Sequence, residues 1–196
     1  QERPEGDRAA RTIAPIAWSG DARWFAYART FVDSQLFVIA RDGGSEISIG
    51  EGWGALWHPT AARLVLFGAG YVRSPTLSLF DLATRTARVL VGGSAGDPPR
   101  RFTNAVWDPV GERIAFGEGD PFAMSVEIST VRADGSARTK VADASSVLQW
   151  STDGSALFSW GWSTRSAQEF RVTNLLTGRV VARGCPRGSL TADPCP

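Results

Sequence analysis

The only histidine of the chain, His58, is the residue through which any Ser-His-Asp or Cys-His mechanism would have to act. It follows Trp57 in a short motif that the chain repeats, and the residues at the same place in the other copies are Ser19, Asp108 and Ser151. A position that holds serine, aspartate or histidine is typical of a tight turn, where the side chain hydrogen-bonds the backbone. We therefore predict a structural role for His58 and no catalytic residue.

The carboxylates of the chain are candidates for metal binding or glycoside hydrolysis. Asp21 and Asp153 lie on the same repeated turns, where an aspartate usually accepts backbone N–H bonds, and the D-x-D-x-D-G spacing of a calcium loop is absent. Glu118 and Asp120 form an acid pair in the loop "GEGDP", whereas a glycosidase needs two carboxylates across a cleft. The glycine-rich stretches lack the following helix of a nucleotide site. We expect no metal site and no cofactor.

Four tryptophans mark a repeat that organises the chain. Trp18, Trp57, Trp107 and Trp150 are spaced 39, 50 and 43 residues apart. After each comes a polar turn and then an apolar run whose alternation is that of a strand buried on both faces. Two further strand-like runs joined by a short turn complete each copy. Four strands in a unit of about forty residues are the pattern of a propeller blade.

The repeat predicts an all-β chain that folds as a β-propeller of four blades, each with four antiparallel strands. The expected blades cover about residues 13–50, 53–93, 103–143 and 146–184. A closed four-bladed ring is the preferred arrangement, and half of a larger ring, completed by a partner or by further sequence, is the alternative. Residues 1–12 are polar and contain proline and glycine, so we expect a tether there.

The turn sequences "WSTDGSALF" and "WDPVGERIAF" resemble the repeat of the TolB-like family of WD-type propellers, which is centred on a Trp-Ser-Pro-Asp-Gly turn. "WSGDARWFAY" is a looser copy, and "WHPTAARLVLF" lacks both the aspartate and the glycine. The resemblance covers residues 13 to 184 and implies a propeller fold. It does not imply one function, because such propellers serve as periplasmic scaffolds, as gates on peptidases and as sensor domains.

The bulk composition is that of an ordinary globular domain. The 196 residues are 43% hydrophobic and 21% charged, with a net charge of +1, so nothing favours nucleic acid as a partner. No apolar run reaches the ~20 residues of a membrane helix. A membrane anchor upstream of Gln1 is an alternative that the sequence leaves open. Cys185 and Cys195, each beside a proline in the tail 185–196, predict a disulfide that closes this tail. A disulfide favours a periplasmic or extracellular location.

Loop lengths predict which end of the propeller binds other molecules. The turns between strands one and two, and three and four, are short in every copy, whereas the links between strands two and three and between blades are longer. Long loops on a rigid scaffold are where binding residues usually lie. We therefore predict a non-enzymatic extracytoplasmic module that binds another protein or a larger assembly. The alternative is a carbohydrate- or small-ligand-binding propeller, either a glycan-active enzyme or a sensor domain. The candidate partner-binding residues are Tyr71, Arg73, Arg101, Phe122, Trp160 and Trp162.

Overall fold

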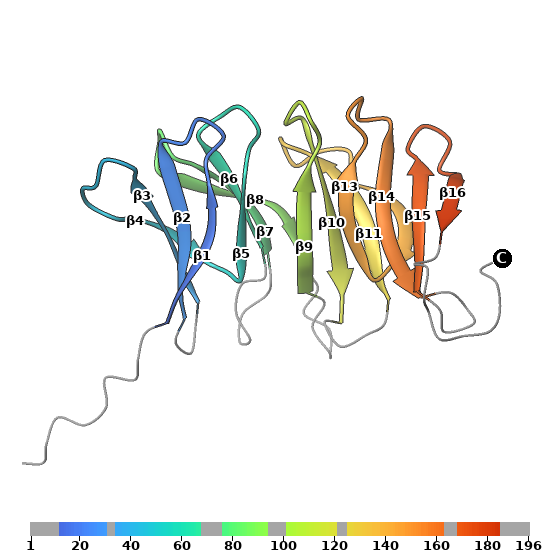
Figure 1. Ribbon diagram of the computed structural model, residues 1–196, viewed down its shortest axis with the longest axis horizontal. Coiled ribbons are helices and arrows are strands. Elements are labelled where there is room, and N and C mark those ends of the chain that lie inside the picture. The colour runs from blue at the N-terminus through green and yellow to red at the C-terminus, as the bar shows by residue number, and fades with distance from the viewer. Residues whose placement is uncertain are drawn as a thin grey trace, which may run out of the picture.

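A computed structural model describes residues 12–30, 34–67, 76–93, 101–120, 125–162 and 168–184. Within these ranges the helices and strands assigned are β-strands alone, and the strands form four separate four-stranded sheets (Figure 1). We name the sheets blades 1 to 4 in chain order.

The strands of the four blades have the following bounds. Blade 1 contains β1 (Thr12–Trp18), β2 (Trp24–Thr30), β3 (Gln35–Ala40) and β4 (Ile47–Glu51). Blade 2 contains β5 (Gly54–Trp57), β6 (Arg63–Phe67), β7 (Thr76–Asp81) and β8 (Thr86–Gly92). Blade 3 contains β9 (Arg101–Trp107), β10 (Arg113–Gly119), β11 (Val126–Arg132) and β12 (Thr139–Ala144). Blade 4 contains β13 (Ser146–Trp150), β14 (Ala156–Trp162), β15 (Gln168–Asn174) and β16 (Val180–Gly184).

Each blade is a meander in which consecutive strands pair in an antiparallel direction. The repeated tryptophan is the last residue of the first strand in every blade, and the polar turn that follows it reverses the chain. Gly111 and Gly154 close two of these turns with positive φ values of 77° and 68°, a conformation that glycine adopts without strain. The predicted all-β propeller of four blades with four antiparallel strands is confirmed.

Apolar clusters between neighbouring blades form the core. Between blades 1 and 2, the fully buried Leu36 and Val38 of blade 1 pack with Leu64 of blade 2. Similar clusters join blades 2 and 3, and blades 3 and 4. Because successive strand residues point to opposite faces, Val65 enters the cluster on the other side of blade 2. Among the described residues, blades 2 and 3 are therefore buried between two neighbouring blades, whereas blades 1 and 4 each pack against one.

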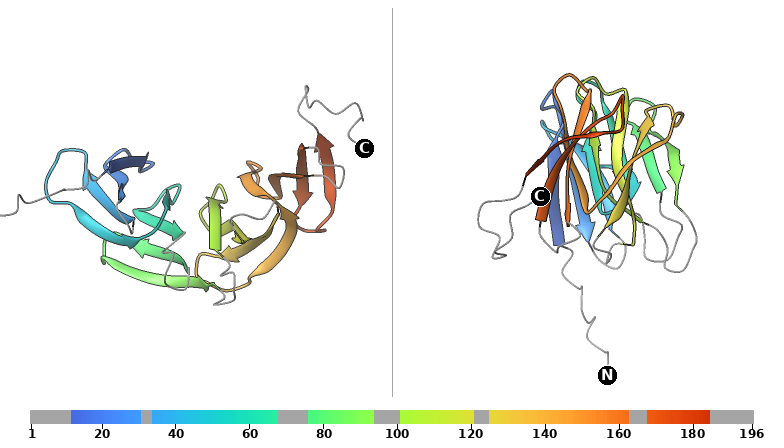
Figure 2. Two further views of the ribbon diagram at one scale, coloured as in Figure 1. Left: turned by 90° about the horizontal axis from the view of Figure 1, so that it is seen from below. Right: turned by 90° about the vertical axis from the view of Figure 1, so that its right-hand side faces the viewer.

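The four blades stand side by side in an open arc, with blades 1 and 4 at its two ends (Figure 2). The inner strands β1, β5, β9 and β13 contact one another in chain order along this arc. The preferred expectation of a closed four-bladed ring is therefore wrong, and the alternative of an incomplete ring describes the arrangement. The physical reason is the angle at each joint. The rotations from sheet to sheet at the three joints do not bring blade 4 back to blade 1 (Figure 2).

Several expectations fall outside the described residues. They include the tail 185–196 with its predicted Cys185–Cys195 disulfide, and the tether except for its last residue, Thr12, which begins β1. In the part of the chain that the structure describes, no helix is long and apolar enough to cross a membrane.

Candidate interaction surface

The residue after each repeat tryptophan holds a tight turn, as predicted. In blade 2 the Nδ1 atom of His58 accepts hydrogen bonds from the backbone N–H groups of Thr60 and Ala61, at 3.1 and 3.0 Å. Its Nε2 atom lies 3.1 Å from the carbonyl oxygen of Gly111 in blade 3 and therefore donates to it. Nδ1 accepts the bonds from Thr60 and Ala61 with its lone pair and is therefore unprotonated, and burial lowers the pKa of His58. Both ring nitrogens of His58 are thus engaged by the backbone of two blades.

Serine and aspartate side chains close the corresponding turns in blades 1 and 4. The Ser151 hydroxyl donates to Asp153 at 2.6 Å and accepts a hydrogen bond from the backbone N–H of Ala156 at 2.9 Å. The hydrogen bond from Ser151 is the main reason that the pKa of Asp153 is lowered to about 2. Ser19 and Asp21 repeat this arrangement in blade 1. Among the described residues, no group of three histidine, cysteine or acidic side chains could hold a metal ion.

The acid pair predicted in a loop is divided between a strand and its end. Glu118 lies inside β10, is 3% exposed and accepts a hydrogen bond of 2.5 Å from Arg138, whereas Asp120 follows the strand. The Arg138 guanidinium also lies 5.7 Å from the ring centroid of Phe116. Glu118 is therefore the buried member of an ion pair within blade 3, whose other member, Arg138, has a side chain that is 39% exposed.

A ladder of indole hydrogen bonds joins the four blades. In each of three joints, the tryptophan of one blade donates its Nε1–H to the carbonyl group of the residue before the tryptophan of the preceding blade. The pairs are Trp57 with Ala17 at 3.1 Å, Trp107 with Leu56 at 3.3 Å, and Trp150 with Val106 at 3.1 Å. The repeated tryptophans thus connect blades to one another as well as packing within them.

Trp18 is the repeat tryptophan that this ladder does not use. Its side chain is 50% exposed, whereas Trp57, Trp107 and Trp150 are 7%, 8% and 4% exposed. Blade 1 lies at the end of the arc, so no preceding blade in the described chain offers a carbonyl group to the Trp18 indole. The exposure of Trp18 follows from its position in the arc and not from its local strand.

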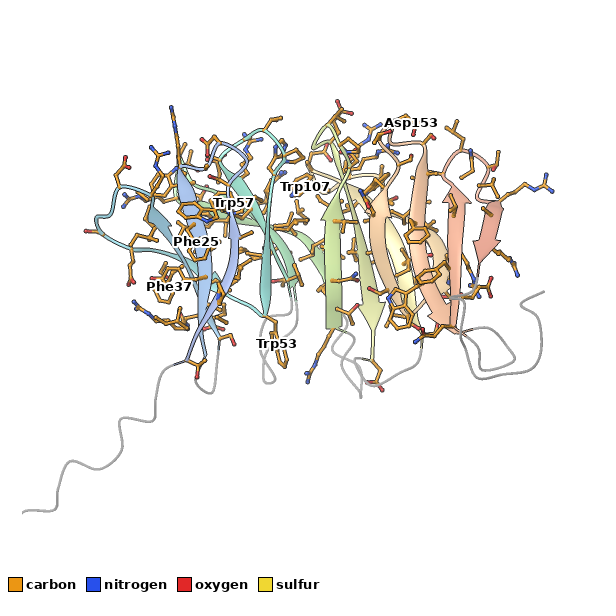
Figure 3. The ribbon with its side chains drawn as sticks, viewed as in Figure 1. Phe25, Phe37, Trp53, Trp57, Trp107 and Asp153 are labelled. Carbon is orange, nitrogen blue, oxygen red and sulfur yellow. The ribbon has the colours of Figure 1, made fainter. Side chains whose placement is uncertain are left out.

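Aromatic rings lie on the face of blade 1 that no other described blade covers, and Figure 3 shows two of them, Phe25 and Phe37. We define the first end face as Trp18, Phe25, Tyr27, Arg29 and Phe37. The ring centroids of Trp18 and Phe25 are 5.1 Å apart, and those of Tyr27 and Phe37 are 5.7 Å apart. The Arg29 guanidinium lies 4.6 Å from the centre of the Phe37 ring. Aromatic and arginine side chains of this kind are enriched at protein–protein interfaces.

The charge on the first end face is neutralised locally. Glu46 forms an ion pair with Arg29 and also accepts a hydrogen bond from the Tyr27 hydroxyl. Burial of the ring, together with the hydrogen bond to Glu46, raises the pKa of Tyr27 to about 12. The paired Arg29 guanidinium lies over the Tyr27 and Phe37 rings, 5.8 and 4.6 Å from their centres, and Tyr27 is only 4% exposed. The most exposed ring of the face is therefore that of Trp18, beside a satisfied ion pair.

The face of blade 4 that no other described blade covers is also aromatic. We define the last end face as Phe158, Trp160, Phe170 and Val172. Phe158 and Phe170 stack with their ring centroids 5.5 Å apart and an interplanar angle of 11°. Trp160 is paired with Phe170, and Phe158 with Val172, across β14 and β15, so alternation places all four on one side of the sheet. Each of the four side chains is half-buried.

The structure places only part of the predicted partner-binding set. The sequence predicts Trp160 and Trp162 at a strand end or in the link after the second strand of blade 4, and both lie in β14, of which Trp162 is the last residue. The reason is that β14 pairs with β15 as far as Trp162, opposite Gln168. Arg101 begins β9. The remaining predicted residues, Tyr71, Arg73 and Phe122, lie outside the described residues.

Trp53 is exposed at the end of the propeller where the longer links lie. It stands between β4 and β5, and its side chain is 56% exposed. Figure 3 places Trp53 at the lower end of the molecule, opposite the tight turn that carries Asp153. Sequence analysis predicts this end, the long-loop end, as the binding end, and Trp53 gives it one exposed aromatic residue among the described ones.

A cavity of about 420 Å³ lies between blades 3 and 4, beside the turn that joins β15 and β16. Its charged lining residues include Arg113 and Lys140. Arg113 forms an ion pair with Asp108 at 3.1 Å, and Lys140 forms one with Asp143 at 2.9 Å. None of the described residues that line this cavity is a histidine, a cysteine or a carboxylic acid.

Comparison with known proteins identifies the fold. No family model matches the sequence, and no curated protein matches it. Among solved structures, TolB from Acinetobacter baumannii matches with a TM-score of 0.61 and 18% identity, over 87% of this chain and 43% of that one. An oligogalacturonate lyase in complex with manganese matches with a TM-score of 0.60 and 12% identity, over 85% and 51%. A structure of the nidogen/laminin complex matches with a TM-score of 0.51 and 13% identity, over 90% and 81%.

The four antiparallel blades and these likenesses define the chain as a β-propeller with a TolB-like fold. The chain spans about half the length of TolB and of the lyase. At these identities the comparisons establish the fold alone, because one propeller fold carries many functions.

The two end faces are the surfaces that sequence reasoning missed. A comparison of the repeats contains a signal for the last end face, since Phe158 and Trp160 replace the smaller Ala26 and Ala28 of blade 1. No such signal exists for Trp18, because the residue itself is the same in every repeat. Its exposure depends on the arc being open.

Proposed function

We propose that this chain is a non-enzymatic, extracytoplasmic β-propeller that binds other proteins as part of an assembly. The observation that carries the proposal is the 50% exposure of Trp18, at a position that is nearly buried in every other blade. An exposed tryptophan beside Phe25, Tyr27 and Arg29 supplies the residue types in which the energy of protein–protein binding is concentrated. A second surface, the long-loop end with Trp53 and Arg101, is available on the same scaffold.

The contacts of the candidate chemical groups support a non-enzymatic role. His58 engages both ring nitrogens with the backbone, and Glu118 is buried against Arg138. The carboxylate of Asp153 is held by Ser151 in a turn. A general base needs a free lone pair within reach of a substrate proton, and these groups instead stabilise the turns and strands of the blades.

The proposed location rests on the sequence. Cys185 and Cys195 stand in a short segment beside prolines, with no nearby histidine to suggest a metal site, so a disulfide is the expected state. The resemblance of the repeat turns to those of TolB-like propellers agrees with a periplasmic or extracellular setting.

Site-specific photo-crosslinking in the cells that make the protein tests this function. A benzophenone amino acid is placed at Ile13, which is 61% exposed at the margin of the first end face, and separately at Trp53. Matched controls carry it at Val110 and Leu176, which are 65% and 89% exposed on the tight turns. We expect protein adducts from Ile13 or Trp53 but not from the controls. Equal adducts at all four positions, or none at any, would contradict the proposal.

A carbohydrate-binding function is the second candidate, and Trp53 favours it. An exposed indole can stack on the apolar face of a sugar ring. Binding of an oligosaccharide panel by the intact chain, lost on Trp53→Ala and kept on Val110→Ala, would support this function in place of protein binding.

A further inference from the structure

The three joints inside the arc follow one rule. On one side of each joint stand a tryptophan and the apolar residue seven positions later, and on the other stand the middle residues of the preceding blade. At the joint between blades 2 and 3, Trp107 and Ile114 pack with Val65, Leu77 and other residues of blade 2 in one cluster. The indole of Trp107 then donates to blade 2, as the other indoles do to their preceding blades. We call these two sides the donor side and the acceptor side of a joint.

The first end face is a donor side without its acceptor. Trp18 and Phe25 occupy the places of Trp107 and Ile114. Ile114 is fully buried in its joint, whereas Phe25 is only half-buried. Blade 1 therefore presents the positions of a donor side at this end of the arc. An internal joint differs in having a second blade packed over these positions.

The last end face is an acceptor side without its donor. Phe158 occupies the place of Ala26, Val65 and Ala115, each of which is 0% exposed inside a joint. Gln149 precedes Trp150 as Ala17 precedes Trp18, so its carbonyl group holds the place of the acceptors in the indole ladder. Gln149 is exposed. Blade 4 therefore offers the acceptor side that blade 1 lacks.

The charges of the first end face also match those of an internal joint. Arg29 and Glu46 occupy the places of Glu118 and Arg138 in blade 3, with the two signs exchanged. In blade 3 the Glu118 member of the pair is only 3% exposed, whereas the Arg138 side chain is 39% exposed. An ion pair whose partners are both present can be partly covered in this way, whereas a single charge cannot. In blade 4, Glu169 forms an ion pair with Arg171 at 3.2 Å on the side of the sheet that faces blade 3, so this pair does not belong to the last end face.

We propose that blade 4 of one chain packs on blade 1 of a second copy, with the Trp18 indole donating to the Gln149 carbonyl group, so that two open arcs close into one eight-bladed ring. Each copy carries one donor side and one acceptor side, so a two-fold pair satisfies all four end faces. A contact between two different surfaces forms a closed ring when its rotation closes and an open filament when it does not. The proposal is the closed case, in which the two ends of the arc in Figure 2 meet the two ends of a second copy. This inference rests on the proposed protein-binding function and names the partner.

The oligomeric state of the chain in solution tests the proposal. Sedimentation velocity over a dilution series should show a monomer–dimer equilibrium. Because the ring contains two identical joints, each substitution acts twice in a dimer of one variant. Trp18→Asp and Phe158→Asp should each weaken the dimer about thirtyfold per joint, and so about a thousandfold in all. Trp18→Phe, which keeps a ring and removes the N–H, should weaken it about fivefold per joint, and so about thirtyfold in all. Val110→Asp, on an exposed turn away from both end faces, should leave the dimer unchanged. Circular dichroism of each variant confirms that the blades remain folded.

A mixing experiment separates the ring from other dimers. In a ring of two Trp18→Asp chains both joints are damaged, and the same holds for two Phe158→Asp chains. When the two variants are mixed, one joint collects both substitutions and the other is native, so dimer should reappear in the mixture. In a dimer that joins two first end faces, mixing the variants would restore no native joint. A mixture that contains no more dimer than the separate variants would overturn the proposal. A wild-type chain that stays monomeric, or that forms filaments, would overturn it as well.

The same measurements distinguish this inference from the broader function. A monomeric chain that still forms adducts with a different protein from Ile13 or Trp53 retains the protein-binding function and refutes the ring. A chain that neither dimerises nor forms adducts refutes both.

Discussion

At the scale of single residues, the turn after each tryptophan shows how the repeat tolerates different side chains. The fourth residue after the tryptophan needs a left-handed backbone in three of the blades. Gly111 and Gly154 supply it, and Ala22 adopts it with a φ of 54°, which is unfavourable for a residue with a Cβ. At Gly111 a Cβ would lie 2.1 Å from Nε2 of His58. Glycine there therefore serves the contact between blades 2 and 3 as well as the turn.

The protonation of His58 should make stability depend on pH. Because burial lowers the pKa of His58 below its ordinary value of 6.5, the unfolded chain binds the proton more readily than the folded one. The stabilisation is then present above pH 6.5 and is lost as the pH falls from there through the folded pKa. Urea unfolding should show the free energy of unfolding decreasing over this range. His58→Asn keeps an acceptor for the turn and should remove the decrease.

Two carboxylates with lowered pKa values titrate outside the pH range in which His58 affects the free energy of unfolding. The lowered pKa values of Asp81 and Asp153 mean that their stabilisation is lost only as the pH falls below about 3.8. A decrease of the same size in wild type and His58→Asn would show that another group is responsible.

At the scale of the elements, each blade depends on its neighbour through the indole ladder and the apolar cluster beside it. The same tryptophan therefore has different energetic weight in different blades. Trp57→Ala removes a buried ring and leaves the carbonyl group of Ala17 without its donor, so we expect a loss of about 3–5 kcal/mol in the free energy of unfolding. Trp18→Ala removes a half-exposed ring at the end of the arc, so we expect a loss of less than about 1.5 kcal/mol. Chemical denaturation at high dilution, where the chain is monomeric, measures both, and equal losses would refute this difference between blades.

The elements were predictable from the sequence because the repeat supplies four versions of one pattern. The tryptophan, the turn and the alternating strand recur with local signals strong enough to define the blades and to assign His58 to a turn. Ring closure was not predictable, since it depends on the rotation between sheets, which the volumes of packed side chains decide. Trp160 was misplaced because "WGWSTRSAQ" reads as a polar link after Trp160, whereas pairing with Phe170 on β15 continues the strand.

At the scale of the whole molecule, stability is expected to vary along the arc. A repeat protein is stabilised by its individual units and by the interfaces between neighbours. Blades 2 and 3 have an interface on each face, whereas blades 1 and 4 have one. An arc is therefore less cooperative than a ring, in which every blade has two neighbours.

Hydrogen exchange should reveal this gradient. In dilute solution the amides of β2 and β3 in blade 1, and of β14 and β15 in blade 4, should exchange at least about tenfold faster than those of β6 and β7 or β10 and β11, because one missing interface worth about 1.4 kcal/mol changes an opening equilibrium by that factor. Raising the concentration should slow exchange in the end blades specifically, since a second copy supplies their missing neighbours. Trp18→Asp should abolish this concentration effect and leave blades 2 and 3 unchanged. Uniform exchange across the four blades at every concentration would show that the end faces have no energetic deficit for a second copy to relieve.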